Sequence, residues 1–138
     1  MARLNDPEEI RRLLAETEVW AVVGLGDHPD RPAYGVARFL QEHGKRIVPV
    51  HPDAATVHGE RGYPSLADIP FDVDVVDVFR RSDAAGAVAD AALERPEVRG
   101  VWFQLGVVDH AAAERVLAAG RTMVMDRCPA IEWPKLLG

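Results

Sequence analysis

Short apolar runs alternate with helix-like stretches along most of the chain. Five of these runs consist largely of β-branched and other apolar residues; they lie at Val19–Val23, Arg46–Val50, Val73–Phe79, Val101–Gln104 and Thr122–Met125. Apolar runs of this length are typical of strands that are buried on both faces of a parallel sheet. The pattern therefore predicts five strands, and Pro49 in the second run predicts only partial pairing there.

The stretches between the runs carry the end signals and the periodicity of helices. Asp6 and Pro7 are typical of a helix start, so a helix is predicted over residues 6–16. The same reasoning predicts three further helices over residues 32–43, 82–95 and 110–119. It also predicts a short helical turn over residues 65–68.

Strands that alternate with helices form βαβ units, in which the crossovers are right-handed and the strands are parallel. We therefore expect an α/β fold, a three-layer Rossmann-like doubly wound parallel five-stranded sheet of order 3-2-1-4-5, counting strands along the chain. Residues 1–138 are expected to form one domain, with an N-terminal helix over about 6–16, a core over about 18–126 and a tail over 127–138. Ligands of such sheets bind beyond the carboxyl ends of the strands.

Composition and charge narrow the classes of function. The chain has 16 Lys and Arg residues against 22 Asp and Glu residues, a net charge of −6, which argues against general nucleic-acid binding. No apolar run approaches the ~20 residues that span a bilayer and no signal peptide is expected, so we expect a cytoplasmic protein without membrane contact. The five histidines lack the spacing of a metal site, and we expect no metal.

The one cysteine, Cys128, excludes an intramolecular disulfide. Two interpretations of it stay open: a small buried apolar group, or, if exposed, a thiol that exchanges with a ligand thiol. Trp133 lies in the predicted tail, where we expect it to cover the sheet edge or a partner.

The loop after the first strand has the chemistry that a phosphate group requires. Gly24 and Gly26 allow close approach of the backbone, the following helix presents free N–H groups, and Arg31 adds a bidentate donor. The dinucleotide fingerprint is incomplete, because Pro29 stands where a third glycine is needed and His51 replaces the acid expected after the second strand. The alternative is a tight turn followed by a solvated arginine.

Seven short motifs in order carry a resemblance to a known family. They are Val22–Gly24, Asp30–Tyr34, Val48–Pro52, Tyr63–Leu66, Val75–Arg80, Gln104–Gly106 and Asp126–Cys128. With these motifs the chain resembles the small stand-alone CoA-binding domain proteins of bacteria and archaea, which are similar to the N-terminal domain of the succinyl-CoA synthetase alpha subunit. The resemblance covers roughly residues 6–133.

The resemblance implies that coenzyme A or an acyl-CoA lies across the strand ends. Its phosphates would contact the first loop and the following helix, at Gly24, Leu25, Gly26, Arg31 and Tyr34. Its adenine and ribose would contact the segment after the second strand, at Val50, His51 and Pro52. Its pantetheine arm would follow the ends of the third and fourth strands, at Phe79, Arg80, Gln104 and Gly106.

Three positions depart from the family pattern. Gly26 stands where the family often has serine, and His51 stands where it usually has asparagine. Asp53 stands where a basic residue is frequent, and an acid there repels a 3′-phosphate.

The sequence contains no nucleophile, base and acid in a pattern typical of an enzyme, and no Gly-x-Ser-x-Gly motif. The resembling synthetase performs its chemistry with a second domain and a second subunit, so the resemblance implies binding without catalysis. Two alternatives stay open: a module that responds to NAD(P) or an adenine nucleotide, and the CoA-binding half of a split acyl-CoA synthetase that needs a partner subunit. A homodimer or another protein partner is compatible with the sequence.

Overall fold

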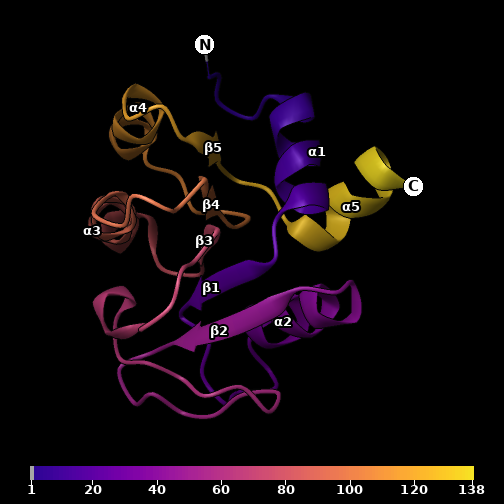
Figure 1. Cartoon of the computed structure of the whole chain (residues 1–138), viewed down its shortest axis with the longest axis vertical. Helices are drawn as coiled ribbons and strands as arrows, with labels where there is room; N and C mark the ends of the chain where they lie inside the picture. Colours follow the sequence, from indigo (N-terminus) through magenta and orange to yellow (C-terminus); the bar gives the residue numbers. More distant parts are fainter. Residues whose placement is uncertain (1) are drawn as a thin grey trace.

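A computed structural model describes residues 2–138 and contains one parallel sheet at its centre (Figure 1). Its five strands are β1 (Val19–Val23), β2 (Arg46–Val50), β3 (Val75–Val78), β4 (Gly100–Phe103) and β5 (Thr122–Val124). Almost every strand residue is buried, as the continuous apolar runs predicted. The predicted α/β class and parallel sheet are confirmed, and Pro49 lies on β2, which is an edge strand.

The predicted strand order 3-2-1-4-5 is wrong, because the order is β2-β1-β3-β4-β5. The helix that connects β1 to β2 is α2 (Pro32–Glu42), which packs on one face of the sheet. The connection from β2 to β3 contains only the short 3-10 helix η1 (Leu66–Asp68), whose Leu66 packs on the opposite face. Right-handed crossovers on opposite faces run in opposite directions, so the chain from β2 passes β1, and β3 pairs with the other side of β1.

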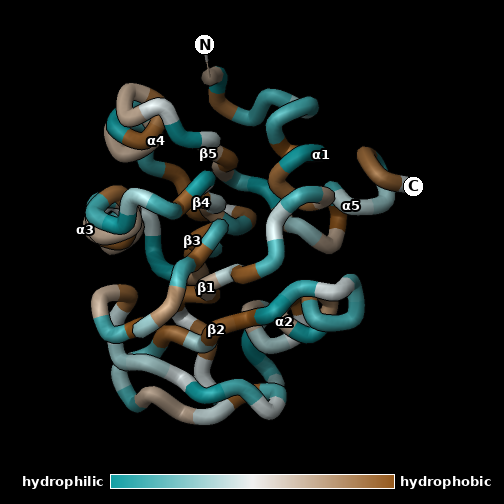
Figure 2. Tube along the Cα trace, viewed as in Figure 1, coloured by the Kyte–Doolittle hydropathy of each residue, from teal (hydrophilic) through white to brown (hydrophobic). Residues whose placement is uncertain are grey.

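Helices cover both faces of the sheet and complete three layers (Figures 1 and 2). One apolar cluster joins the sheet to α3 (Ser82–Leu93) and α4 (His110–Ala118). The other cluster joins it to α1 (Pro7–Glu16) and α2, with α5 (Pro129–Leu137) packed alongside. Within residues 2–138, none of the helices has both the length and the apolar character that crossing a membrane requires.

The segment expected as a C-terminal tail is the helix α5. Its Trp133 packs against α2 and the residues that follow it, with ring centroids 6.2 Å from Phe39 and 4.8 Å from His43. Trp133 therefore covers a neighbouring helix of its own chain rather than the sheet edge.

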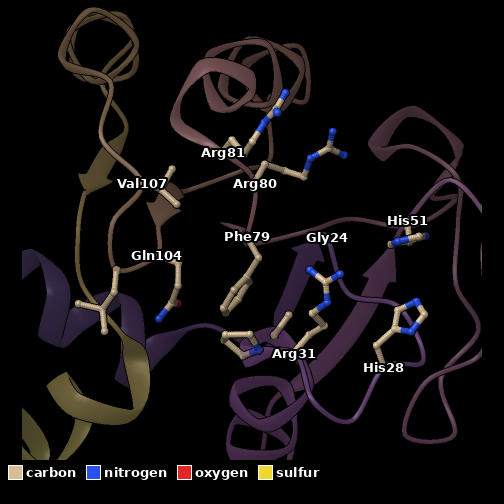
Figure 3. A pocket seen from close by; sticks show the side chains of 12 residues that line it. Gly24, His28, Arg31, His51, Phe79, Arg80, Arg81, Gln104 and Val107 are labelled. Atoms are coloured by element: carbon tan, nitrogen blue, oxygen red, sulfur yellow. The ribbon is translucent and has the colours of Figure 1, made fainter.

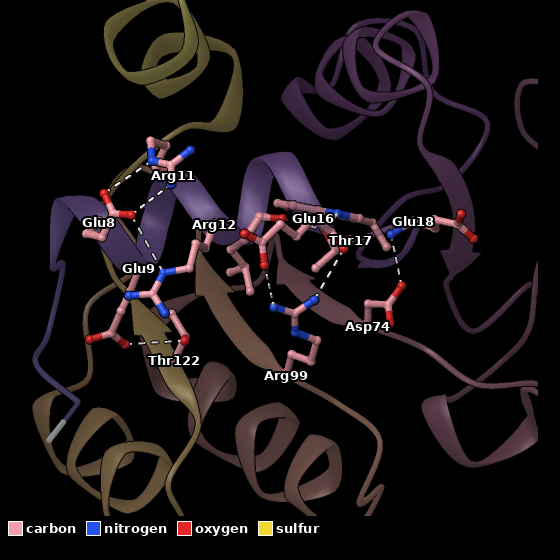
Figure 4. Close-up of polar contacts among 12 residues, drawn as sticks. Glu8, Glu9, Arg11, Arg12, Glu16, Thr17, Glu18, Asp74, Arg99 and Thr122 are labelled. Atoms are coloured by element: carbon pink, nitrogen blue, oxygen red, sulfur yellow. Dashed lines mark hydrogen bonds and ion pairs between the residues drawn. The ribbon is translucent and has the colours of Figure 1, made fainter.

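Polar contacts close the amino-terminal end of the sheet (Figure 4). The Asp74 carboxylate accepts hydrogen bonds from the backbone N–H groups of Glu18 and Val19, both at 2.9 Å. Arg99 donates to the backbone oxygen of Glu16 at 3.2 Å and to its carboxylate at 3.4 Å. These contacts join α1, β1 and the start of β4, and they leave the carboxyl-terminal end of the sheet as the open one.

Candidate functional site

The carboxyl ends of the strands surround a cavity of about 540 Å³ on the α2 side of the sheet (Figure 3). It lies between the ends of β1 and β3. From β1 the chain continues to β2 on one side, and from β3 it continues to β4 on the other side, and doubly wound sheets bind ligands at such a position. Its lining contains Gly24, His28, Arg31, Pro32, Ala33, His51, Phe79, Arg80, Arg81, Gln104, Leu105 and Val107. Six of the residues predicted from the sequence are in this set: Gly24, Arg31, His51, Phe79, Arg80 and Gln104.

Gly24 allows the ends of β1 and β3 to lie close together at the base of this cavity. Its φ angle is +100°, and a Cβ atom at this position would lie 2.3 Å from the backbone oxygen of Phe79. Its N–H donates to the Val50 oxygen at 2.8 Å, which ties the end of β1 to the end of β2. A side chain at position 24 would push these strand ends apart, so the fold requires glycine at this position.

The N-terminus of α2 faces the same cavity. Arg31 is the N-cap residue, and its side chain makes no capping hydrogen bond, while Pro32 and Ala33 of the first turn line the cavity. The N–H groups of a first helical turn have no partner within the helix, and together with the helix dipole they favour an anion. Figure 3 shows the Arg31 side chain extending toward the same space as Phe79 and Gln104.

Arginines from the end of β3 provide further positive charge. Arg81 lies 3.3 Å from Asp83 and is paired with it. The Arg80 side chain has no ion pair in the described part of the chain, and it lines the cavity. Arg80 and Arg31 are therefore the two cations best placed to meet an anionic ligand.

A second, smaller cavity of about 270 Å³ lies on the α3 side of the same strand ends. Its walls are mostly apolar side chains from β1, from the end of β2 at Val50, from the η1 segment and from α3. His51, Pro52 and Arg80 complete the lining. His51 and Arg80 line both cavities, so the two form one continuous stretch along the carboxyl end of the sheet. A charged cavity joined to an apolar slot suits a ligand with an anionic middle and a flat apolar end.

Two buried polar side chains near the site lack partners within residues 2–138. Gln104 is 6% exposed, and its Oε1 atom accepts no hydrogen bond. Asp77 on β3 is fully buried with both carboxylate oxygens unpartnered, and this burial raises the pKa of Asp77 well above its usual value. Asp77 is paired in register with Trp102, two residues before Gln104, so both polar side chains lie on the same face of neighbouring strands.

Several predicted site residues lie outside both cavities. Leu25 is fully buried in the core, and Tyr34 packs against His58, with ring centroids 4.2 Å apart. Gly106 has a φ angle of +81° and donates its N–H to Asp126 at 2.8 Å. Gly26 is buried, with the His28 and His51 rings beside it. These four residues contact other parts of the protein, and none of them lines either cavity.

Sequence reasoning missed a cluster that the fold assembles at the cavity rim. His28, His51 and Asp53 place one potential metal-ligand atom each within 4.8 Å of one another. His28 lies in the loop after β1 and the other two in the loop after β2, so no short sequence spacing could reveal the group. Cys128, in contrast, is buried at the start of α5 and lines neither cavity.

A family model described as a CoA binding domain matches residues 18–134. The chain belongs to the CoA-binding domain family. The resemblance stated from the sequence motifs is therefore confirmed, and the match covers the whole sheet and most of α5.

Relatives of this CoA-binding domain are small proteins of similar length. The chain is 38% identical over 120 residues to the uncharacterized protein YneT of Bacillus subtilis, covering 87% of this chain and 88% of the relative. It is also similar to a solved structure of a hypothetical protein from Pyrococcus horikoshii, with a TM-score of 0.90, 33% identity and coverage of 100% of this chain and 99% of the other.

The same fold also occurs inside a larger protein. A dinucleotide-forming acetyl-coenzyme A synthetase from Candidatus Korarchaeum cryptofilum matches 85% of this chain with a TM-score of 0.71 and 22% identity. The matched region spans 27% of that synthetase chain. At this identity the likeness concerns the fold.

Proposed function

We propose that this CoA-binding domain holds CoA or an acyl-CoA along the carboxyl end of its sheet and has no chemistry of its own. The observation that carries the proposal is the pair of joined cavities at the strand ends, in a chain of this family. The charged cavity offers Arg31, Arg80 and the N-terminus of α2 to phosphate groups.

The smaller cavity suits the adenine ring. Adenine needs an apolar slot with backbone polar groups nearby, and the walls here come from Val50, Pro52 and the apolar side chains of η1 and α3. His51 and Arg80 stand at the junction, where the ribose and the phosphates would pass from one cavity to the other.

The pantetheine arm fits the remaining wall of the larger cavity. Phe79, Leu105 and Val107 supply apolar surface, and the unpartnered Oε1 atom of Gln104 is an acceptor for one of the two amide N–H groups of pantetheine. A buried acceptor without a partner costs stability, so a ligand that donates a hydrogen bond to it removes this cost and binds more tightly.

Thermal unfolding of the purified chain with a panel of ligands tests this assignment. We expect CoA and acetyl-CoA to raise Tm more than NADH or ADP, because only they fill the charged cavity, the apolar slot and the pantetheine wall together. Stronger stabilisation by NADH would replace the proposal with a nicotinamide-nucleotide module. Equal stabilisation by CoA and dephospho-CoA would show that the 3′-phosphate is not recognised. The negative charge of Asp53 disfavours binding of this phosphate.

Any catalytic use of the bound ligand would require a partner. The one hydroxyl among the lining residues is that of Ser65, which donates to the Asp68 carboxylate at 2.8 Å at the start of η1 and, among the described residues, has no histidine or third group beside it in a catalytic pattern. The synthetase of similar fold is several times longer than this chain. Co-purification from the native source tests this: a stoichiometric ATP-binding subunit would support a split synthetase, and its absence would support a stand-alone binder.

A further inference from the structure

Two imidazoles and a carboxylate meet at the rim of the charged cavity. His28, His51 and Asp53 each offer one ligand atom, and these atoms lie within 4.8 Å of one another. His28 and Asp53 are exposed and His51 is half-buried, so the group is accessible from solvent. Figure 3 shows the His28 and His51 rings next to each other, at the opposite side of the cavity from Gln104.

The backbone brings these side chains together. A Cβ atom on Gly26 would lie 2.9 Å from Cδ2 of His28 and 3.2 Å from Cδ2 of His51, so a side chain there would shift the two rings from their present positions. The loop is held by the His28 N–H donating to Gly26 at 2.9 Å and by the Arg31 N–H donating to His28 at 3.0 Å. Glycine at position 26 thus leaves the space in which the two histidine rings lie.

A turn after β2 adds the carboxylate. The Ala54 N–H donates to the His51 oxygen at 2.8 Å, and this turn places Asp53 Oδ1 2.7 Å from Nδ1 of His51. His51 and Asp53 are therefore in direct contact. An acid at the entrance of a phosphate site is unfavourable by itself, whereas an acid that holds a cation there is favourable.

We propose that His28, His51 and Asp53 form a three-ligand site for a transition-metal dication such as Zn²⁺. Two imidazoles and a carboxylate are a ligand set that Zn²⁺ accepts, and three protein ligands leave one tetrahedral position open. Ligand atoms around such an ion are about 3.3 Å apart when the bonds are about 2 Å long. The His51–Asp53 pair at 2.7 Å would separate slightly, and the other distances, all within 4.8 Å, would need only small side-chain movements.

The open position would face the ligand cavity, because both histidines line it together with Arg31 and Arg80. We assign this position to a phosphate oxygen of the bound ligand, and this second part rests on the proposed function. The cation would offset the negative charge that Asp53 places at the entrance of a phosphate site.

Calorimetric titration of Zn²⁺ into the full chain, freed of metal with EDTA, tests the site itself. We expect one Zn²⁺ per chain, and a Co²⁺-loaded sample should show the visible absorption of a tetrahedral ion. H28A and D53N should each weaken binding by more than about tenfold, because even changes outside the ligand set cost that much. H110Q, which alters an exposed histidine on α4, is the matched control and should bind as the wild type does. Absence of stoichiometric binding, or unchanged binding by H28A and D53N, would overturn the site.

Acetyl-CoA affinity measured with Zn²⁺ and with EDTA tests the bridging phosphate, since the thioester removes a thiol that would itself bind zinc. We expect Zn²⁺ to strengthen acetyl-CoA binding in the wild type, with no effect in D53N and none on phosphate-free S-acetylpantetheine. If acetyl-CoA binds equally with Zn²⁺ and EDTA, the bridge is wrong and the proposed function stands. If Zn²⁺ binds and acetyl-CoA binds under neither condition, the proposed function fails and the metal site stands.

Discussion

The two ends of the sheet use their polar side chains in opposite ways. At the amino end, Asp74 is bound to backbone N–H groups, and Arg99 is bound to Glu16 (Figure 4). At the carboxyl end, within residues 2–138, Arg31 and Arg80 have no ion pair and Gln104 has an unpartnered oxygen. Both ends are built from the same five strands, so the difference lies in the loops.

This difference separates groups that hold the fold from groups that await a ligand. A buried acceptor without a partner costs stability, so its presence indicates that another molecule completes it. Gln104 meets this condition more strictly than the exposed arginines, because its side chain is buried in the cavity wall. Four substitutions test how far the two ends can be treated as independent.

The largest effect is expected for G24A at the carboxyl end. The added Cβ would overlap the backbone oxygen of Phe79, so we expect the free energy of unfolding to fall by more than about 3 kcal/mol. G44A at the amino end is the matched control: Gly44 also has a positive φ, but its Cβ would meet open space, and its loss should be about 1 kcal/mol. Urea unfolding measures both, and similar losses would show that the close contact at Gly24 is relaxed in solution.

A smaller effect is expected for R31A, and it should appear in binding. Loss of a charge-assisted hydrogen bond to phosphate costs about 1.5–3 kcal/mol, which corresponds to a rise in the Kd for CoA of roughly ten- to a hundredfold. R99A removes an arginine of the amino end and should leave this Kd unchanged. Calorimetry with CoA compares the variants, and an unaltered Kd for R31A would place the phosphates elsewhere.

Asp77 links stability to pH from the centre of the sheet. Burial raises the pKa of Asp77 in the folded chain above its unfolded value of 3.8, so the folded state keeps a proton that the unfolded state loses. Stability relative to D77N should therefore fall as pH rises from 3.8 to the folded pKa, by at most about 1.4 kcal/mol per pH unit. Urea unfolding at several pH values measures this difference, and a constant difference across that range would contradict a buried protonated carboxyl.

The smallest effect is expected for R99A on stability. Arg99 and Glu16 are both about half exposed, and exposed ion pairs contribute less than about 1 kcal/mol. Chemical unfolding at low and high salt measures the loss. A loss of several kcal/mol would show that the amino end is held by this pair rather than by the buried core.

The chain's pattern was sufficient to predict the five strands and all the helices before α5, because continuous apolar runs and capping residues are local signals. The strand order could not be predicted in the same way, because it depends on which face of the sheet the connection from β2 to β3 crosses. That connection is a loop with one short helix, and its sequence does not indicate which face it covers. The helix α5 was missed as well: Pro134 inside it and its short length weaken the helical signal.

For the site, sequence reasoning predicted what the backbone topology places at the strand ends, including Gly24, Arg31 and Gln104. It placed Leu25 and Tyr34 beside the ligand, but their side chains belong to local packing that only the folded chain reveals. It gave no role to Asp77, a charged residue inside an apolar strand, which the structure shows to be fully buried and outside both cavity linings.

The most direct test of the account is a titration of CoA into the ¹⁵N-labelled chain, followed by the chemical shifts of its backbone amides. We expect the largest shift changes at Gly24, Ala33, Phe79 and Gln104 at the carboxyl end, and none at Asp74 or Arg99 at the amino end. Changes that centre on the amino end, or no saturable change at millimolar CoA, would contradict the assignment of the carboxyl end as the CoA site.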